Sequence, residues 1–169
     1  DKMSVLPTDI KWHMIGHLQT NKVKYIVGKT ELIHSVDSLH LAKEIEKQAA
    51  KNNVLQPILV EVNIAQEESK FGIFKEEAID LIRNIATLPH LQIKGLMTIA
   101  PFVENPEENR LYFRQIRQLS VDIENENIDN VDMKVLSMGM TGDYEVAIEE
   151  GATIVRVGTG IFGERNYNI

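Results

Sequence analysis

Residues 137–145 read Ser137-Met138-Gly139-Met140-Thr141-Gly142-Asp143-Tyr144-Glu145, and residues 154–163 read Ile154-Val155-Arg156-Val157-Gly158-Thr159-Gly160-Ile161-Phe162-Gly163. Both stretches pass from an apolar, strand-like run into a loop that is rich in glycine and hydroxyl groups. Glycine lets the backbone approach an anion closely, and the N-terminus of a helix offers unpaired N–H groups. Two such loops after successive parallel strands predict a cup for one phosphate.

Strands and helices are predicted to alternate along the rest of the chain. Apolar runs typical of buried strands are followed by segments whose apolar residues recur at helical spacing. One helix start is marked by Asn105-Pro106-Glu107-Glu108, in which a cap residue precedes Pro and two acids. The predicted strands cover residues 12–16, 32–36, 57–64, 93–98, 134–137 and 153–157. Each is followed by a predicted helix, so the pattern indicates a parallel α/β sheet.

Two architectures fit six such strands, an open doubly wound sheet and a (β/α)8 barrel of the TIM type. The open sheet is the ordinary expectation for six strands, whereas phosphate loops after the last two strands are typical of the barrel. A full barrel needs two more βα units, which would occupy roughly 60 residues at the spacing of this chain. No linker or low-complexity tract divides the chain, so residues 1–169 are expected to form a single domain.

The composition narrows the classes of function. The chain has 169 residues, of which 43% are hydrophobic and 25% charged, enough for one domain with a core. Its net charge of −7 argues against a nucleic-acid-binding surface and, more weakly, against binding to an anionic membrane. The sequence contains no cysteine and no apolar run as long as a transmembrane helix. We therefore expect a cytoplasmic protein without nucleic-acid or membrane partners.

The candidate binding residues lie where the predicted strands end, which is where α/β proteins build their sites. Taken alone, each loop is explained by glycines that allow a turn and hydroxyl groups that cap a helix. Taken together, the two loops favour phosphate binding. The residues concerned are Ser137, Gly139, Gly158, Thr159 and Gly160.

Arg156 is a charged residue in an otherwise apolar strand, and burying an unpaired charge is costly. Two partners for its guanidinium are equally open at this point: an internal salt bridge with Glu61, and a ligand beside the phosphate. His17 follows the first predicted strand and is placed to line the mouth of a site. The histidines lack the spacing of a metal site, so no metal is expected.

The stretch Trp12-His13-Met14-Ile15-Gly16-His17-Leu18-Gln19-Thr20-Asn21-Lys22 resembles the WHFIGxLQxNK signature of the pyridoxal phosphate homeostasis proteins (YggS/PROSC type). Further similar blocks follow in the family's order at residues 69–72, 95–98, 136–143 and 155–163. The resemblance covers essentially the whole chain. It implies a single-domain TIM-type barrel related to the N-terminal domain of alanine racemase.

The resemblance also implies a cofactor, pyridoxal 5'-phosphate (PLP). The family holds PLP on a lysine near the end of its first strand, which precedes the Trp-His block. In this chain the Schiff-base lysine is therefore expected upstream of Asp1, and the chain is expected to hold only the last six βα units of eight. The implied function is intracellular PLP (vitamin B6) and amino-acid homeostasis without catalysis. The alternative is a PLP-dependent, racemase-like enzyme that acts on a small amino acid.

The resemblance implies a role at the cofactor for eight residues. These are Ser137, Gly139, Met140, Gly158 and Thr159 at the phosphate, Arg156 at the pyridine nitrogen, and His17 and Met97 around the cofactor. A guanidinium that is always charged disfavours protonation of the pyridine nitrogen and leaves the ring a poorer electron sink. This favours a carrier or a racemase-like mechanism over a transaminase.

An oligomeric state is also expected from the strand count. Full-length proteins of the family are expected to be monomers. Six strands of an eight-stranded barrel leave two unpaired edges, which invite pairing with another chain. We therefore expect the present chain to self-associate through these edges.

Overall fold

Six parallel strands form one sheet in the computed structural model, which describes residues 2–67 and 70–164. Of the residues named above, Asp1 and Ser69 lie outside these ranges. The strand order is β1-β2-β3-β4-β5-β6, so each strand pairs with its neighbours in sequence. The strands are β1 (His13–Met14), β2 (Leu32–Val36), β3 (Gln56–Glu61), β4 (Leu91–Met97), β5 (Val131–Met140) and β6 (Ile154–Arg156).

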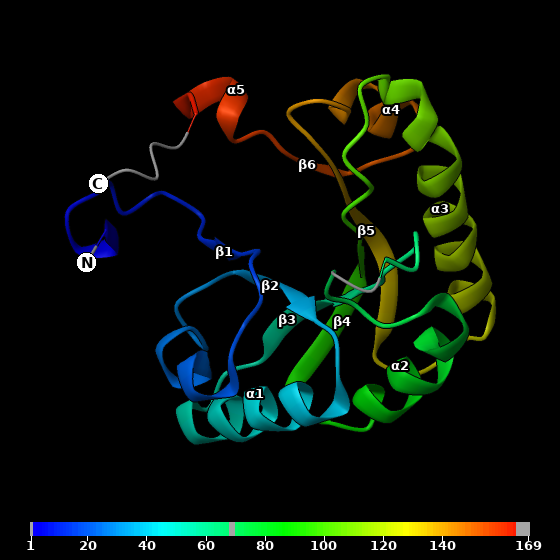
Figure 1. Cartoon of the computed structure of the whole chain (residues 1–169). Coiled ribbons are helices and arrows are strands. Elements are labelled where there is room, and N and C mark those ends of the chain that lie inside the picture. Colours follow the sequence, from blue (N-terminus) through cyan, green and yellow to red (C-terminus); the bar gives the residue numbers. More distant parts are fainter. Residues whose placement is uncertain (1, 68–69, 165–169) are drawn as a thin grey trace.

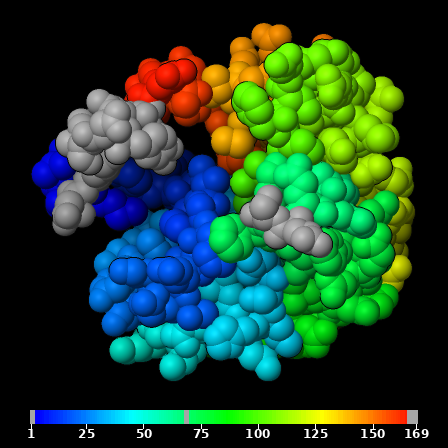
Figure 2. All heavy atoms as spheres, in the orientation of Figure 1, coloured from blue at the N-terminus to red at the C-terminus, as the bar shows by residue number. Residues whose placement is uncertain are grey.

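Helices connect successive strands and lie along the outside of the curved sheet (Figure 1). The α-helices are α1 (Leu39–Asn52), α2 (Ala78–Ala86), α3 (Arg110–Asn125), α4 (Tyr144–Glu149) and α5 (Thr159–Phe162). The 3-10 helices are η1 (Lys2–Ser4), η2 (Thr20–Tyr25), η3 (Lys75–Glu77) and η4 (Pro106–Asn109). In the space-filling view, the blue to cyan N-terminal part and the yellow to orange C-terminal part occupy opposite sides of the molecule (Figure 2).

The two faces of the sheet are packed differently, and this distinguishes the two predicted architectures. The outer face joins the helices in one large apolar core, to which Ile58 and Val60 of β3 belong. The inner, concave face carries a separate small cluster built on Leu32, Leu59 and Met97. Among the described residues, no helix contributes to this inner cluster, whereas a doubly wound sheet carries helices on both faces. The chain is therefore a parallel α/β half-barrel, with β1 and β6 at its two edges.

Gly95 sets the spacing between β4 and β5. Its φ is 151°, and a Cβ at this position would overlap the carbonyl oxygen of Val135. The register of the two strands shifts between Ile93 and Gly95. The missing side chain thus lets β5 lie close against β4 at the irregularity.

Most elements agree with their predicted positions. Ser38 begins α1 as a cap, because its hydroxyl accepts a hydrogen bond from the N–H of Leu41 at 3.3 Å. Asn105 caps η4 in the same way, accepting from Glu107 at 3.2 Å.

Four elements differ from prediction, and one of them is β3, which ends at Glu61 instead of at residue 64. The strand expected over residues 12–16 is only two residues long, since β1 lies at the edge of the sheet and pairs on one side. The helix predicted after the first strand is the 3-10 helix η2. β5 is longer than the predicted residues 134–137 and runs on to Met140, which carries it into the first glycine-rich loop.

Candidate functional site

A layer of buried polar side chains lies on the concave face of the sheet. Residues two apart on a strand point to the same face. Four strands use this spacing to place a polar residue on the carboxyl side of an apolar one. The pairs are Leu32 and His34 on β2, Leu59 and Glu61 on β3, Val135 and Ser137 on β5, and Ile154 and Arg156 on β6. The four polar residues are all buried, and each lies nearer to the carboxyl end of its strand than its apolar partner.

Arg156 is the charged centre of this polar layer. Its Nη1 donates to Oγ of Ser137 at 2.8 Å, and its Nη2 donates to the carbonyl oxygen of Thr98 at 2.8 Å. Burial lowers the pKa of Arg156 to about 10, so the guanidinium remains charged at neutral pH. In the described part of the chain no carboxylate lies within ion-pair distance of it, and the salt bridge with Glu61 is not formed.

Two histidines continue the hydrogen bonds away from Arg156. Nδ1 of His34 lies 2.9 Å from Oγ of Ser137, and Nε2 of His34 lies 3.0 Å from Nδ1 of His13. His34 is fully buried. Burial, His13 and Arg156 together lower the pKa of His34 to about 3, so this imidazole is neutral.

Glu61 lies on the same face, one strand beyond Met97. Register pairs Glu61 with Met97 and Met97 with Ser137, so Met97 forms the apolar floor between the two polar residues. The Glu61 side chain is 4% exposed, and its Oε2 has no hydrogen-bond partner among the described residues. Burial, with a further contribution from the Asp37 carboxylate, raises the pKa of Glu61 to about 7.

The two glycine-rich loops meet at Thr141. Its Oγ1 accepts hydrogen bonds from the backbone N–H groups of Gly158 and Gly160, both at 3.2 Å. The backbone donors of the second loop therefore converge on a single oxygen supplied by the first. A Cβ on Gly158 would meet no atom within 4 Å, so the space beside these donors is open. We call the two loops around Thr141 the cup; that they bind an anion stays a prediction.

Asp143 braces the first loop of the cup. Its Oδ1 accepts from the N–H of Met140 at 2.7 Å, and its Oδ2 accepts from Nδ2 of Asn109 at 2.8 Å. Asn109 in turn donates to the carbonyl oxygen of Pro101 at 2.9 Å. The loop is thus tied to the start of α3 and to the segment after β4. A cavity of about 270 Å³ lies against it and is lined in part by Lys70, Gly139 and Met140.

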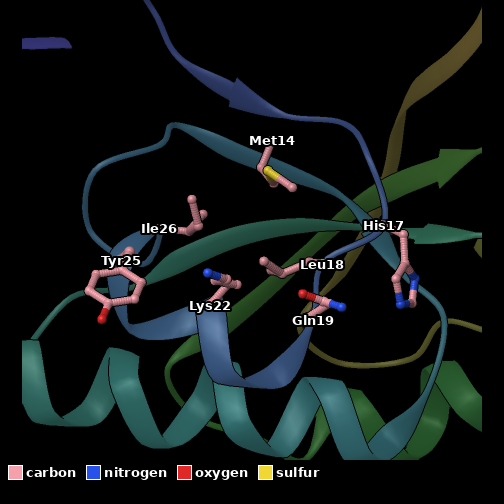
Figure 3. A pocket seen from close by; sticks show the side chains of 7 residues that line it. All are labelled: Met14, His17, Leu18, Gln19, Lys22, Tyr25 and Ile26. Atoms are coloured by element: carbon pink, nitrogen blue, oxygen red, sulfur yellow. The ribbon is translucent and has the colours of Figure 1, made fainter. Parts of the chain in front are cut away.

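A second cavity, of about 400 Å³, lies away from the cup beside η2 (Figure 3). Its lining is mainly apolar, with Met14, Leu18 and Ile26. Among the predicted site residues only His17 lines it, at the opposite end of the row from Tyr25. The ring of His17 stacks on Phe71 with centroids 3.9 Å apart.

Comparison with known proteins places this geometry in a family. A family model described as the N-terminal domain of alanine racemase matches residues 6–166. The pyridoxal phosphate homeostasis protein of Aquifex aeolicus is 54% identical over 159 residues, covering 94% of this chain and 69% of that protein. The chain belongs to the pyridoxal phosphate homeostasis protein family. The match confirms the resemblance of the sequence motifs and the alanine-racemase-like type of fold.

Solved structures of members of this fold agree. PipY of Synechococcus elongatus, solved with PLP bound, superposes with a TM-score of 0.84 at 31% identity, covering 96% of this chain and 74% of PipY. A protein from Bifidobacterium adolescentis, described as unknown, superposes with a TM-score of 0.86 at 41% identity. That match covers 90% of this chain and 61% of the other chain.

In this family member, the eight predicted residues lie in three places. Gly158 and Thr159 lie at the cup, beside the start of α5. Ser137, Arg156 and Met97 lie in the buried interior of the half-barrel. Met140, Gly139 and His17 lie on the rim: Met140 and His17 are exposed, and Gly139 packs against α4.

Two residues of the site were missed by sequence reasoning. Thr141 lies inside a quoted motif, but the motif gave no role to its hydroxyl, which accepts the hydrogen bond from Gly158. His34 lies within a strand, and only the i, i+2 pattern of an apolar and then a polar residue marks it. The same pattern marks Glu61 and is visible in the sequence.

Two further features bear on function. None of the helices described in the structure has the length and apolar character required to cross a bilayer. In residues 2–67 and 70–164, no group of three or more acidic, histidine or cysteine side chains is arranged to hold a metal ion.

Proposed function

We propose that this chain binds PLP at the carboxyl ends of β5 and β6 and serves PLP homeostasis without catalytic turnover. One observation carries the proposal: the N–H groups of Gly158 and Gly160 converge on one oxygen, two residues beyond the buried guanidinium of Arg156. A phosphate group and a heteroaromatic acceptor beside it would satisfy both features. The PLP bound to the relative PipY supports this choice of ligand.

The cup fits a phosphate. Its hydrogen bonds to Thr141 are long, at 3.2 Å, and an anionic phosphate oxygen is a stronger acceptor than a hydroxyl. The Thr141 hydroxyl keeps its own hydrogen, which it can donate to a phosphate that takes these two donors. The Ser137 hydroxyl is engaged with Arg156 and His34, so we assign the side-chain contact with phosphate to Thr141. We assign the remaining contacts with the phosphate to Gly158, Thr159, Gly139 and the backbone of Met140.

The interior fits the ring. Arginine carries five N–H groups, and among the described residues only Nη1 and Nη2 of Arg156 donate hydrogen bonds, one each. The others are available to an acceptor such as an unprotonated pyridine nitrogen. PLP, when bound, acts as an electron sink whose strength depends on protonation of that nitrogen. A charged Arg156 disfavours this protonation, which speaks against a transaminase; the carrier is separated from the racemase-like alternative by experiment. Met97 and His17 would lie around the cofactor.

The test compares three ligands in equilibrium dialysis: PLP, pyridoxal without its phosphate, and inorganic phosphate. PLP should bind most tightly, and phosphate should compete with it. Arg156→Gln should leave phosphate binding largely intact and shift the absorbance maximum of bound PLP. Arg83→Gln, an exposed arginine of α2, is the matched control. Equal binding of PLP and pyridoxal would refute the proposal.

The racemase-like alternative predicts a different result. An enzyme of that class would exchange the Cα hydrogen of a small amino acid with solvent. Deuterium exchange into alanine is measured by mass spectrometry with the PLP-loaded protein and with free PLP. We expect equal rates, and a rate well above that of free PLP would favour the enzyme.

A further inference from the structure

We propose that Ser137 and His34 are positioning residues, which hold Arg156 through a hydrogen-bond chain that runs in one direction from Arg156 to His13. The chain itself is a property of the ligand-free protein. The effect of this chain on PLP binding rests on the proposed function above. Ser137 and His34 would affect PLP only by holding the guanidinium of Arg156 and not by contacting the ligand themselves.

The direction of the chain follows from the chemistry of its first member. Arginine can only donate, so Oγ of Ser137 must accept from Nη1 of Arg156. The Ser137 hydroxyl is 1% exposed, and the described residues offer its hydrogen no other partner than Nδ1 of His34. A buried hydroxyl that leaves its hydrogen unpaired is disfavoured. Ser137 therefore donates to His34.

The second step fixes the tautomer of His34. Because Nδ1 accepts from Ser137, the single proton of the neutral ring lies on Nε2. That proton is donated to Nδ1 of His13 at 3.0 Å. The buried position of His34 between Arg156 and His13 keeps it neutral, so it cannot donate from both nitrogens.

The chain matters for Arg156 because little else directs this side chain. Its only other hydrogen bond in the described structure is with the carbonyl oxygen of Thr98. Glu61 and Asp143 attract the guanidinium electrostatically but are not in contact with it. Ser137 and Thr98 each hold one terminal nitrogen, which fixes the guanidinium plane and leaves its other donors without a hydrogen-bond partner among the described residues. A hydroxyl that donates to His34 is also a better acceptor for Arg156, because neighbouring hydrogen bonds polarise one another.

A merely structural role makes a different prediction. If the buried polar groups served only to fill the interior, any well-packed replacement would affect stability alone. If Ser137 and His34 position Arg156, a residue that replaces His34 must keep a hydrogen-bond acceptor where Nδ1 of His34 lies. Asn and Gln separate these cases, because the amide of Asn reaches the place of Nδ1 and that of Gln reaches the place of Nε2.

The first arm of the test needs no PLP. ¹⁵N NMR of ligand-free protein reports the tautomer of each imidazole, and the signal of His34 is assigned as the one lost in His34→Asn. We expect the Nε2–H tautomer, unchanged between pH 5 and pH 8. The Nδ1–H tautomer, or titration near the ordinary histidine pKa of about 6.5, would overturn the chain.

The second arm measures PLP affinity and the absorbance maximum of bound PLP. His34→Asn should stay within about threefold of the wild-type affinity, whereas His34→Gln and Ser137→Ala should lose about tenfold and shift the maximum. Inorganic phosphate should bind all variants alike, because the cup lies at Thr141. Equal PLP affinity and equal maxima across the three variants would show a structural role only.

The two arms distinguish a failure of the proposed function from a failure of the hydrogen-bond chain. Wild-type protein that binds no PLP would refute the proposed function, while the NMR result would still decide the direction of the chain. Circular dichroism checks that each variant folds. If the variants do not fold, the NMR arm on wild-type protein, with signals assigned through the bonded neighbour His13, decides alone.

Discussion

A Cβ on Gly139 would lie 2.6 Å from the Cβ of Ala147 and 3.0 Å from the Cα of Tyr144. Gly139 has a φ of 88°, a conformation that side chains other than glycine rarely adopt. The end of β5 therefore packs directly against α4, and Thr141 follows this contact by two residues. The packing of Gly139 against α4 therefore constrains the start of the first loop of the cup in the ligand-free protein.

Replacement of Gly139 by Ala should consequently destabilise the protein. The strained φ and the overlap with Ala147 together should lower the free energy of unfolding by about 2–4 kcal/mol, measured by urea denaturation. Gly142→Ala is the matched control in the same loop, since a Cβ there meets nothing within 4 Å. Equal losses for the two variants would contradict the packing argument.

The Thr141 hydroxyl should be needed for the cup. Thr141→Val keeps the shape of the side chain but removes the acceptor for Gly158 and Gly160, and it removes the donor that we assign to phosphate. We expect inorganic phosphate to bind about tenfold more weakly in isothermal titration. Thr141→Ser retains the oxygen and should bind like the wild type. A Val variant that matches the Ser variant would remove Thr141 from the site.

Glu61 should make stability depend on pH. Its pKa is raised from 4.5 to about 7 by burial and by Asp37, and only partly offset by Arg156. Between these pH values the folded state holds a proton that the unfolded state has released. The free energy of unfolding therefore falls as pH rises through this window and stays low above it.

Glu61→Gln removes this dependence. At pH 8 the variant should exceed the wild type in stability by on the order of 2–3 kcal/mol, and the difference should disappear below pH 4.5. Urea denaturation at several pH values measures both. The depressed pKa of His34 contributes equally to the pH dependence of stability in the wild type and in the variant. The difference between their free energies of unfolding therefore reports on Glu61 alone. A constant difference across the pH range would show that the carboxyl does not titrate in the fold.

The local features of the fold could be predicted from the sequence, whereas the contacts of the site could not. A cap such as Asn105 acts within a few residues, and the glycine-rich loops follow directly from their strands. The bond between His34 and Ser137 joins residues 103 positions apart and depends on the curvature of the sheet. The spacing along a strand predicts on which face of the sheet a side chain lies. It does not predict which residue of another strand that side chain will contact. For Arg156, for example, the sequence left a salt bridge with Glu61 and a ligand equally open, and the structure shows hydrogen bonds with Ser137 and Thr98.

The edge strand β1 should drive self-association of this chain in solution. In the described part of the chain β1 pairs only with β2, and Ile15, which follows β1, is exposed. Unpaired strand edges recruit other chains, and a charge at the edge opposes this. We expect light scattering to show a mass that rises with concentration, and Ile15→Lys to suppress the rise. Leu55→Lys, an exposed apolar residue before β3, is the control. A constant monomeric mass in the wild type would show that these edges do not pair.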